Sequence, residues 1–305
     1  MKVLYVVGSC LTKNTSANMS HNAYVQGLIE NGCDVDIVMA KDSWGAHDNA
    51  LPRWEMANYY EFNSQTFADK LRKKATKSVL KNPVVETKAD SYQKSNSIFN
   101  LKIVIRKIIK KAFYILFPTD PIYPLEKKWL KEAIKFRSNI EYDLVISNSS
   151  PAASHKLVGD LLNKNKIKCR RWVQIWEDPW YFDLYGGHSD AIRDEEHSLL
   201  REANEIYYVS PLTLEYQKTY YSDCAQKMKC IPLSYFEVKR QCLSEIKKDT
   251  FGYFGDYFSN TRNIIPFYNA IRSISAKGYI YGDSDIHLSD SDNLDISGRV
   301  TLDKL

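Results

Sequence analysis

The sequence of 305 residues has few of the residues that mark fibrous, disordered or disulfide-rich chains. Its 12 glycines and 10 prolines are too few for collagen-like or low-complexity structure. Its six cysteines are scattered, which is ordinary usage for a reducing compartment and too sparse for a disulfide framework. Cys224 and Cys230 have no histidine at the spacing of a zinc motif, so we expect no metal site. These absences leave a globular chain with a length close to that of two ordinary domains.

The sequence also lacks a long apolar segment. The uncharged stretch at residues 3–12 is too short to cross a bilayer. Lys13 and a polar run at 14–22 occupy the place where a signal peptide would have its cleavage site. We therefore expect a cytoplasmic protein.

The net charge of +5 comes from one segment. Between Lys70 and Lys111 thirteen Lys and Arg residues face two acids, which gives +11 there and −6 for the rest of the chain. From Ile98 to Phe117 a helical wheel places an apolar arc opposite a basic one. This pattern is typical of a helix on an anionic membrane surface, which would place the protein at the inner face of the membrane. A core helix with a solvated lysine face is the other interpretation.

No recognisable DNA- or RNA-binding motif accompanies this charge. We therefore expect no nucleic acid partner. The basic segment alone could also make the protein a scaffold at a membrane surface.

Apolar runs alternate with amphipathic stretches along the first 236 residues. We expect strands at 1–7, 34–39, 142–147, 171–176 and 205–210, and helices at 20–31, 151–163, 188–203 and 211–221. The alternation predicts a doubly wound, Rossmann-like α/β domain at residues 1–236. Residues 41–140 are too irregular to assign, and they hold a basic insertion at about 64–117.

A polar linker at 237–248 leads to a second α/β series at residues 249–305. We expect strands at 250–255 and 278–281 with a helix at 263–276 between them. The second series is long enough for only part of a Rossmann-like domain.

Candidate ligand-binding residues follow the predicted strands, because parallel sheets bind ligands at the carboxyl ends of their strands. Gly8 and Ser9 open a loop rich in hydroxyl and amide groups that runs to His21. The loop lacks the G-x-G-x-x-G motif and the P-loop motif, so it does not indicate a cofactor. A sugar-like ligand suits its chemistry, and a plain connector is the alternative. His155 lies inside a predicted helix, and we interpret it as structural.

Glu177 and Asp178 follow another predicted strand, between Trp176 and Trp180. We expect the acids to bind carbohydrate hydroxyls and the indoles to stack on sugar rings. An acidic helix cap beside packing aromatics is the alternative. Arg262, at the expected start of a helix, indicates a site for a phosphate diester, or else is a solvated first-turn residue.

The order of these segments resembles the GT-B-fold retaining glycosyltransferases, the nucleotide-sugar-dependent enzymes that build bacterial polysaccharides and glycolipids. It is carried by the Gly8 loop, residues 142–153, Trp-Glu-Asp-Pro-Trp, residues 203–210, Ile-Pro-Leu at 231–233, residues 252–257 and residues 296–305. The resemblance implies an α/β GT-B-like fold with a partial second domain, a nucleotide-sugar donor, and a glycan or lipid-linked acceptor. It implies no cofactor, because the nucleotide sugar is a substrate, and no metal.

The resemblance also implies roles for single residues. Asp178 would be catalytic, and the acceptor would contact Gly8, Ser9, His21 and Glu177. The donor would contact Gly255, Arg262, Gly298 and Arg299.

Two departures from the family pattern matter. Family members continue past the segment that matches residues 298–300, through a helix with two glutamates that hold the donor, so we expect a truncated second domain and weak transfer by the chain alone. Asp256 stands where many members have an arginine. A non-catalytic or partner-dependent carbohydrate-binding half of such an enzyme is therefore a second candidate function beside the transferase.

Overall fold

The computed structural model describes residues 1–43, 46–65, 120–149, 151–183, 188–236, 249–259, 262–274 and 276–301. These form two compact units, of which unit 1 comprises Met1–Cys10, Gly32–Ser43 and Met56–Pro232, and unit 2 comprises Leu11–Asn31, Trp44–Glu55 and Leu233–Leu305. The predicted basic helix from Ile98 to Phe117 and the predicted linker at 237–248 lie outside the described residues. The domain boundaries placed at that linker stay a prediction.

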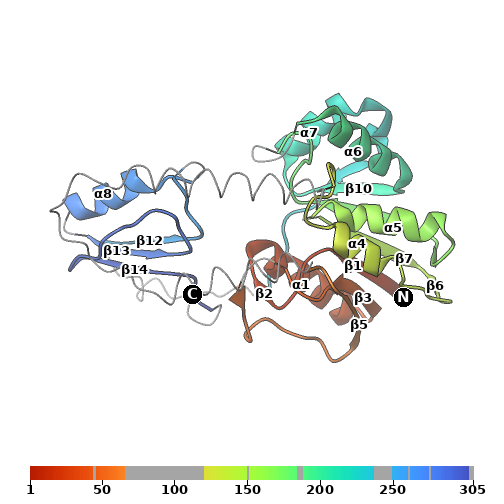
Figure 1. Cartoon of the computed structure of the whole chain (residues 1–305), viewed down its shortest axis with the longest axis horizontal. Coiled ribbons are helices and arrows are strands. Elements are labelled where there is room, and N and C mark those ends of the chain that lie inside the picture. The colour runs from red at the N-terminus through yellow and green to blue at the C-terminus, as the bar shows by residue number, and fades with distance from the viewer. Residues whose placement is uncertain are drawn as a thin grey trace, which may run out of the picture. The chain divides into compact units, whose positions relative to one another are not determined.

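Unit 1 is built on a seven-stranded sheet in the order β11-β10-β9-β7-β1-β3-β5, and all its neighbouring strands run parallel (Figure 1). The strands are β1 (Lys2–Val7), β3 (Asp34–Ala40), β5 (Ala57–Phe62), β7 (Leu144–Asn148), β9 (Trp172–Trp176), β10 (Glu205–Tyr208) and β11 (Met228–Cys230). The inner strands are mainly apolar and largely buried, as expected for a sheet covered on both faces. The two edge strands, β5 and β11, were not expected, because β5 lies in the stretch at 41–140 that the sequence left unassigned and β11 has only 3 residues.

Helices connect these strands. They are α4 (Lys127–Ala133), α5 (Ala153–Asn163), α6 (Asp190–Glu202), α7 (Pro211–Tyr220) and the 3-10 helix η1 (Ser222–Lys227), with a short pair of strands, β6 (Glu141–Tyr142) and β8 (Lys168–Cys169), at one side. Ser189 and Ser210 begin α6 and α7, since their hydroxyls accept hydrogen bonds from the helices' free backbone N–H groups. Two buried apolar clusters form the core, one around Trp129 and Trp172 and the other around Trp176.

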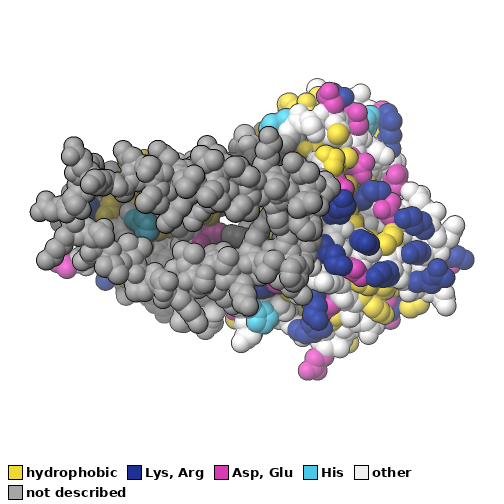
Figure 2. All heavy atoms as spheres, viewed as in Figure 1, with side chains coloured by type: hydrophobic (Ala, Val, Ile, Leu, Met, Phe, Trp, Pro, Cys, Tyr) yellow, Lys and Arg dark blue, Asp and Glu magenta, His cyan; other side chains and the backbone are white. Residues whose placement is uncertain are grey.

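Lysine and arginine side chains gather over α4 and α5 in Figure 2. Helix α4 alone carries Lys127, Lys128 and Lys131. Some of this charge is paired, since Lys128 lies 2.6 Å from Glu132 and Lys156 on α5 lies 2.6 Å from Asp160. Positive charge is therefore not confined to the predicted basic segment.

Unit 2 contains a three-stranded parallel sheet in the order β12-β13-β14. Its elements are β12 (Thr250–Phe254), α8 (Ile265–Ser273), β13 (Lys277–Tyr281) and β14 (Leu294–Ser297), together with α1 (Ser16–Glu30) and the paired strands β2 (Lys13–Asn14) and β4 (Ala46–His47). Helix α1 begins four residues earlier than expected, because the Thr15 hydroxyl accepts the backbone N–H of Asn18 and so caps it. The core of the C-terminal part lies around Tyr268, Ile271 and Ile280.

The mostly parallel α/β architecture expected from the sequence is confirmed in both units. Among the residues that the structure describes, no helix combines the length and apolar character that a membrane span requires. In each unit the carboxyl ends of the parallel strands meet at one edge, and this places the candidate residues.

Candidate functional site

The carboxyl ends of β1, β7 and β9 lie side by side in the unit 1 sheet. The chain leaves β1 for β3 on one side, whereas β7 and β9 lie on the other, so the order of the strands reverses between β1 and β7. Open α/β sheets bind ligands at this kind of switch point. Gly8 follows β1 and donates its N–H to the Ser154 hydroxyl (2.8 Å), while Glu177 follows β9 and donates its N–H to the Ser149 hydroxyl (3.1 Å).

The close approach of chain segments at this edge requires glycine at position 8. A Cβ atom on Gly8 would lie 2.7 Å from Cγ of Pro151 and 2.9 Å from its Cδ. Ser9 is half-buried, and its carbonyl accepts the backbone N–H of Ala40 (3.2 Å). The structure therefore brings Gly8, Ser9 and Glu177 to one edge.

His21 is placed differently from the expectation. Helix α1 begins at Ser16, so His21 lies within the helix rather than at the end of the loop, and its exposed fraction is 0%. In this structure it presents no surface to a ligand.

The loop after β9 carries the two predicted acids, with Glu177 half-buried and Asp178 exposed. The buried carboxylate of Glu196 on α6 holds this loop, because it accepts the N–H groups of Trp180 (3.1 Å) and Tyr181 (2.9 Å). Burial raises the pKa of Glu196, although these hydrogen bonds oppose the shift. Glu196 is a positioning residue that sequence reasoning missed, since it is one acid among several on an amphipathic helix.

The two tryptophans that flank the acids both pack against other side chains of unit 1. Trp176 is 1% exposed, donates its indole N–H to Gln174 (3.0 Å) and packs on the His155 ring at 4.2 Å between centroids. Trp180 is half-buried and packs against Tyr123 at 5.2 Å. The expectation that both indoles stack on sugar rings is wrong, because Trp176 is buried in the core.

His155 and Ser147 form a buried pair, with Nδ1 of the imidazole 2.7 Å from the hydroxyl oxygen. That oxygen also accepts the indole N–H of Trp172 (2.8 Å). Burial lowers the pKa of His155 to about 3, so the imidazole is neutral. Since both side chains are fully buried, the pair cannot reach a substrate, in agreement with the structural role expected for His155.

In unit 2 the carboxyl ends of the three strands also meet. Gly255 after β12 donates its N–H to the carbonyl of Tyr281 (2.9 Å), and Gly282 after β13 donates to that of Ser297 (3.0 Å). A Cβ atom on Gly282 would lie 1.9 Å from the Gly255 carbonyl oxygen, so only glycine fits there. Gly298 follows β14, and the structure thus places Gly255 and Gly298 at the same edge.

Arg299 lies at this edge between two carboxylates. Its guanidinium pairs with Asp256, and its Nε atom lies 3.4 Å from Oδ2 of Asp283. It also donates to the backbone carbonyl of Asn14, whose side chain in turn donates to the Val300 carbonyl (2.9 Å). A guanidinium is the group best shaped to bind a diphosphate, but here Asp256 and Asp283 occupy it.

Arg262 lies outside the first turn of α8. Its side chain is exposed, its N–H donates to the Phe258 carbonyl (3.1 Å), and the helix begins only at Ile265. The Asn263 side chain accepts the N–H of Ile265 (3.0 Å) and so occupies part of the helix N-terminus. Among the residues that the structure describes, the Arg262 side chain makes no ion pair with Asp256 or Asp283, whereas Arg299 pairs with both, and a donor role for Arg262 stays a prediction.

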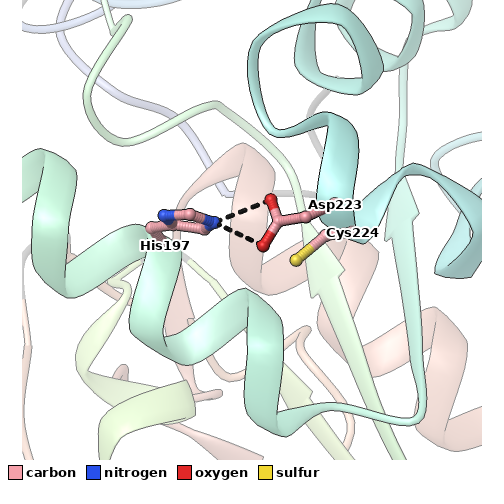
Figure 3. Close-up of side chains that lie close together, drawn as sticks. All are labelled: His197, Asp223 and Cys224. Carbon is pink, nitrogen blue, oxygen red and sulfur yellow. Dashed lines mark hydrogen bonds and ion pairs between the residues drawn. The ribbon is translucent and has the colours of Figure 1, made fainter.

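A third cluster joins α6 to η1 and was missed in the sequence, where His197 lies 26 positions before Asp223 (Figure 3). His197 Nε2 lies 2.9 Å from Oδ1 of Asp223, and the ligand atoms of His197, Asp223 and Cys224 lie within 4.8 Å of one another. Arg201 donates to the same carboxylate (2.9 Å), and hydrogen bonds from His197 and Arg201 lower the pKa of Asp223. Burial raises the pKa of the Cys224 thiol, which opposes the thiolate that a metal needs. We interpret the cluster as a structural contact that holds η1 against α6.

The fold of the chain matches solved structures, whereas no protein-family model and no curated protein matches its sequence. An α-glucosyltransferase in complex with UDP and a 13-mer DNA gives a TM-score of 0.50 at 12% identity, over 100% of this chain and 68% of that one. Arabidopsis thaliana UGT89C1 with UDP also gives 0.50, at 10% identity, over 98% of this chain and 70% of that one. The chain has a GT-B-like glycosyltransferase fold. The fold expected from the order of the motifs is thereby confirmed.

The comparison corrects the expectation that nucleic acid plays no part. A GT-B α-glucosyltransferase with UDP was solved on DNA, so this fold does not exclude a nucleic acid partner. The expectation rested on a missing sequence motif. Contacts to a phosphate backbone need positive charge and hydrogen-bond donors rather than a motif, which is why that reasoning was wrong.

Proposed function

We propose that this GT-B-fold protein transfers a sugar from a nucleotide-sugar donor to a glycan or lipid-linked acceptor in the synthesis of a surface polysaccharide or glycolipid. One observation supports the proposal most strongly. The carboxyl edge of one parallel sheet has groups that suit an acceptor sugar, and the carboxyl edge of the other has a group that suits the donor diphosphate. The edge in unit 1 has exposed and half-buried acids, Asp178 and Glu177, which suit sugar hydroxyls. The edge in unit 2 has the Arg299 guanidinium, which suits a diphosphate.

The reaction assigns these groups distinct tasks. The acceptor hydroxyl oxygen forms a bond to the anomeric carbon of the donor sugar, and the bond from that carbon to the diphosphate oxygen breaks. Asp178 accepts the hydroxyl proton, while Glu177, Gly8 and Ser9 bind the neighbouring part of the acceptor. Arg299 stabilises the negative charge that gathers on the leaving diphosphate.

UDP-sugars are the first donors to examine, because both fold neighbours were solved with UDP. A lipid-linked acceptor belongs to the proposal because the sequence from Ile98 to Phe117 combines an apolar arc with a basic arc. Such a segment would hold the protein at the surface in which the acceptor is anchored.

A transfer assay with UDP-sugars and calorimetry with UDP test the proposal together. We expect Asp178→Asn to lower turnover about 100-fold or more, the usual contribution of a general base, with no change in UDP affinity. Glu141→Gln removes an exposed acid elsewhere in unit 1 and should change neither quantity. Unchanged turnover in Asp178→Asn would contradict the catalytic assignment. UDP binding without transfer would favour the alternative of a non-catalytic or partner-dependent carbohydrate-binding half.

A further inference from the structure

Four aromatic side chains of unit 1 contact one another beside the acidic loop. Tyr181 and Phe182 lie in that loop, and Tyr216 and Tyr220 lie one turn apart on α7. The Phe182 ring meets Tyr216 and Tyr220 edge to face, at 4.8 Å and 4.6 Å between centroids. The Tyr181 ring stacks with Tyr220 at 6.0 Å. We call these four residues the aromatic platform.

The two tyrosines of the platform that lie on α7 are on its partly exposed face. Tyr216 and Tyr220 are 53% and 41% exposed, and Leu212, one turn earlier on the same face, is 85% exposed. Another face of the helix buries Leu214 and Gln217. Helix α7 therefore packs against the core with one face and exposes aromatic side chains on another. Partly exposed aromatic side chains that lie together are typical of ligand-binding surfaces.

The buried carboxylate of Glu196 fixes both segments that form the platform, the loop after β9 and the end of α7. Glu196 accepts the N–H of Tyr181 (2.9 Å) and the hydroxyl of Tyr221 (3.0 Å), which follows Tyr220 in the chain. The edge-to-face contacts further fix how the rings are turned. Rings that are already ordered lose little conformational freedom when a ligand binds.

Polar groups on α6 and α7 favour a carbohydrate over an anionic surface as the ligand. Arg193 pairs with Asp190 (2.9 Å) and Asp194 (3.0 Å), and Glu215 pairs with Lys218 (3.3 Å). Figure 2 shows charged side chains of both signs among hydrophobic ones over these helices. Such groups hydrogen-bond sugar hydroxyls, whereas anionic lipid or a phosphate backbone requires an excess of cations.

We propose that the aromatic platform is a subsite for the acceptor glycan and binds a sugar ring at some distance from the reacting hydroxyl. The C–H face of that ring packs on the exposed aromatic rings. Phe182 follows Asp178 by four residues, which limits the distance between their Cα atoms to about 14 Å, within reach of a short oligosaccharide. The inference rests on the proposed function for the identity of the ligand, and it makes the acceptor an oligosaccharide rather than a single sugar.

Glycan binding tests the platform without donor or transfer. The labelled full chain is applied to an array of oligosaccharides made of hexoses, 6-deoxyhexoses and N-acetylhexosamines. We expect Tyr216→Ala to weaken binding to the best-bound glycan about tenfold, and Tyr216→Phe to stay within about twofold, because the ring makes the contact. Tyr235→Ala, at a 71% exposed side chain of unit 2, is the matched control and should bind as the wild type does.

Transfer kinetics separate this inference from the proposed function. With a donor that the chain uses, Tyr216→Ala should raise KM for the best-bound oligosaccharide about tenfold. It should leave UDP affinity and KM for a monosaccharide acceptor unchanged. If transfer fails altogether, the array still decides the platform, and the UDP titration decides the donor side.

Two results would overturn the inference. One is equal array binding by the wild type and Tyr216→Ala, and the other is no glycan binding by the wild type. Loss of binding to phosphatidylglycerol vesicles in Tyr216→Ala, with glycan binding unchanged, would also overturn it and assign the platform to a membrane. Tyr220→Ala is the second variant and should repeat the loss, while circular dichroism checks that both variants fold.

Discussion

Asp256 should compete with the donor diphosphate for the Arg299 guanidinium. The exposed fractions of the two side chains, 13% for Asp256 and 19% for Arg299, mean that solvent screens the pair only partly. Asp256→Asn removes the charge and keeps an amide oxygen that can accept the N–H of Asp283, which lies 3.0 Å from the carboxylate. Because UDP no longer has to displace a carboxylate, its binding should tighten by about 1–2 kcal/mol, roughly 5- to 30-fold.

Calorimetric titration of UDP measures this effect directly. Arg299→Ala should weaken UDP binding by about 1.5–3 kcal/mol, the contribution of a charge-assisted hydrogen bond. In that background Asp256→Asn should change UDP affinity much less, because the group over which the two anions compete is gone. The gain from Asp256→Asn should also shrink at high salt.

Asp295→Asn is the matched control for Asp256→Asn. Asp295 lies on β14 in the same unit, is exposed, and accepts a hydrogen bond from Tyr281 rather than from Arg299. It removes the same charge and should leave UDP affinity nearly unchanged. If Asp256→Asn binds UDP no better than the wild type or this control, competition at Arg299 is refuted.

Three further predictions concern the stability of the fold. Gly8→Ala should cost about 1–3 kcal/mol in urea unfolding, because its Cβ would lie 2.7 Å from Pro151, whereas Gly27→Ala, with nothing within 4 Å, should stabilise by up to about 1 kcal/mol. The pKa of His155 is lowered to about 3, so the unfolded chain binds a proton at this residue before the folded chain does as the pH falls below about 6.5. The free energy of unfolding should therefore fall with pH below about 6.5, and His155→Gln should reduce the slope of that fall by about 1.4 kcal/mol per pH unit. Glu196→Ala should lower the free energy of unfolding by about 1–3 kcal/mol for each loop N–H left without an acceptor, and Glu196→Gln should lower it by less. A melting temperature of Glu196→Ala equal to that of the wild type would contradict the positioning role of Glu196.

The sequence predicted the inner strands and most helices of both units, because their signals are local. An apolar run such as residues 2–7 indicates a buried parallel strand, and Ser189 and Ser210 mark helix starts through their own hydroxyl groups. The sequence did not predict the edge strands β5 and β11. A half-exposed or very short strand forms because it pairs with a neighbouring strand in the sheet, and its own residues give little signal.

The sequence by itself determined that the chain forms parallel α/β units and which residues follow their strands. Only the tertiary structure decided that Trp176 fills the core while Tyr216 faces solvent, because both are aromatic in sequence and burial depends on which face of an element is packed. It likewise decided that Arg299, and not Arg262, lies among the carboxylates of Asp256 and Asp283. Those contacts join residues that are 43 and 16 positions apart in the chain, and they exist only because the ends of three parallel strands meet at one edge.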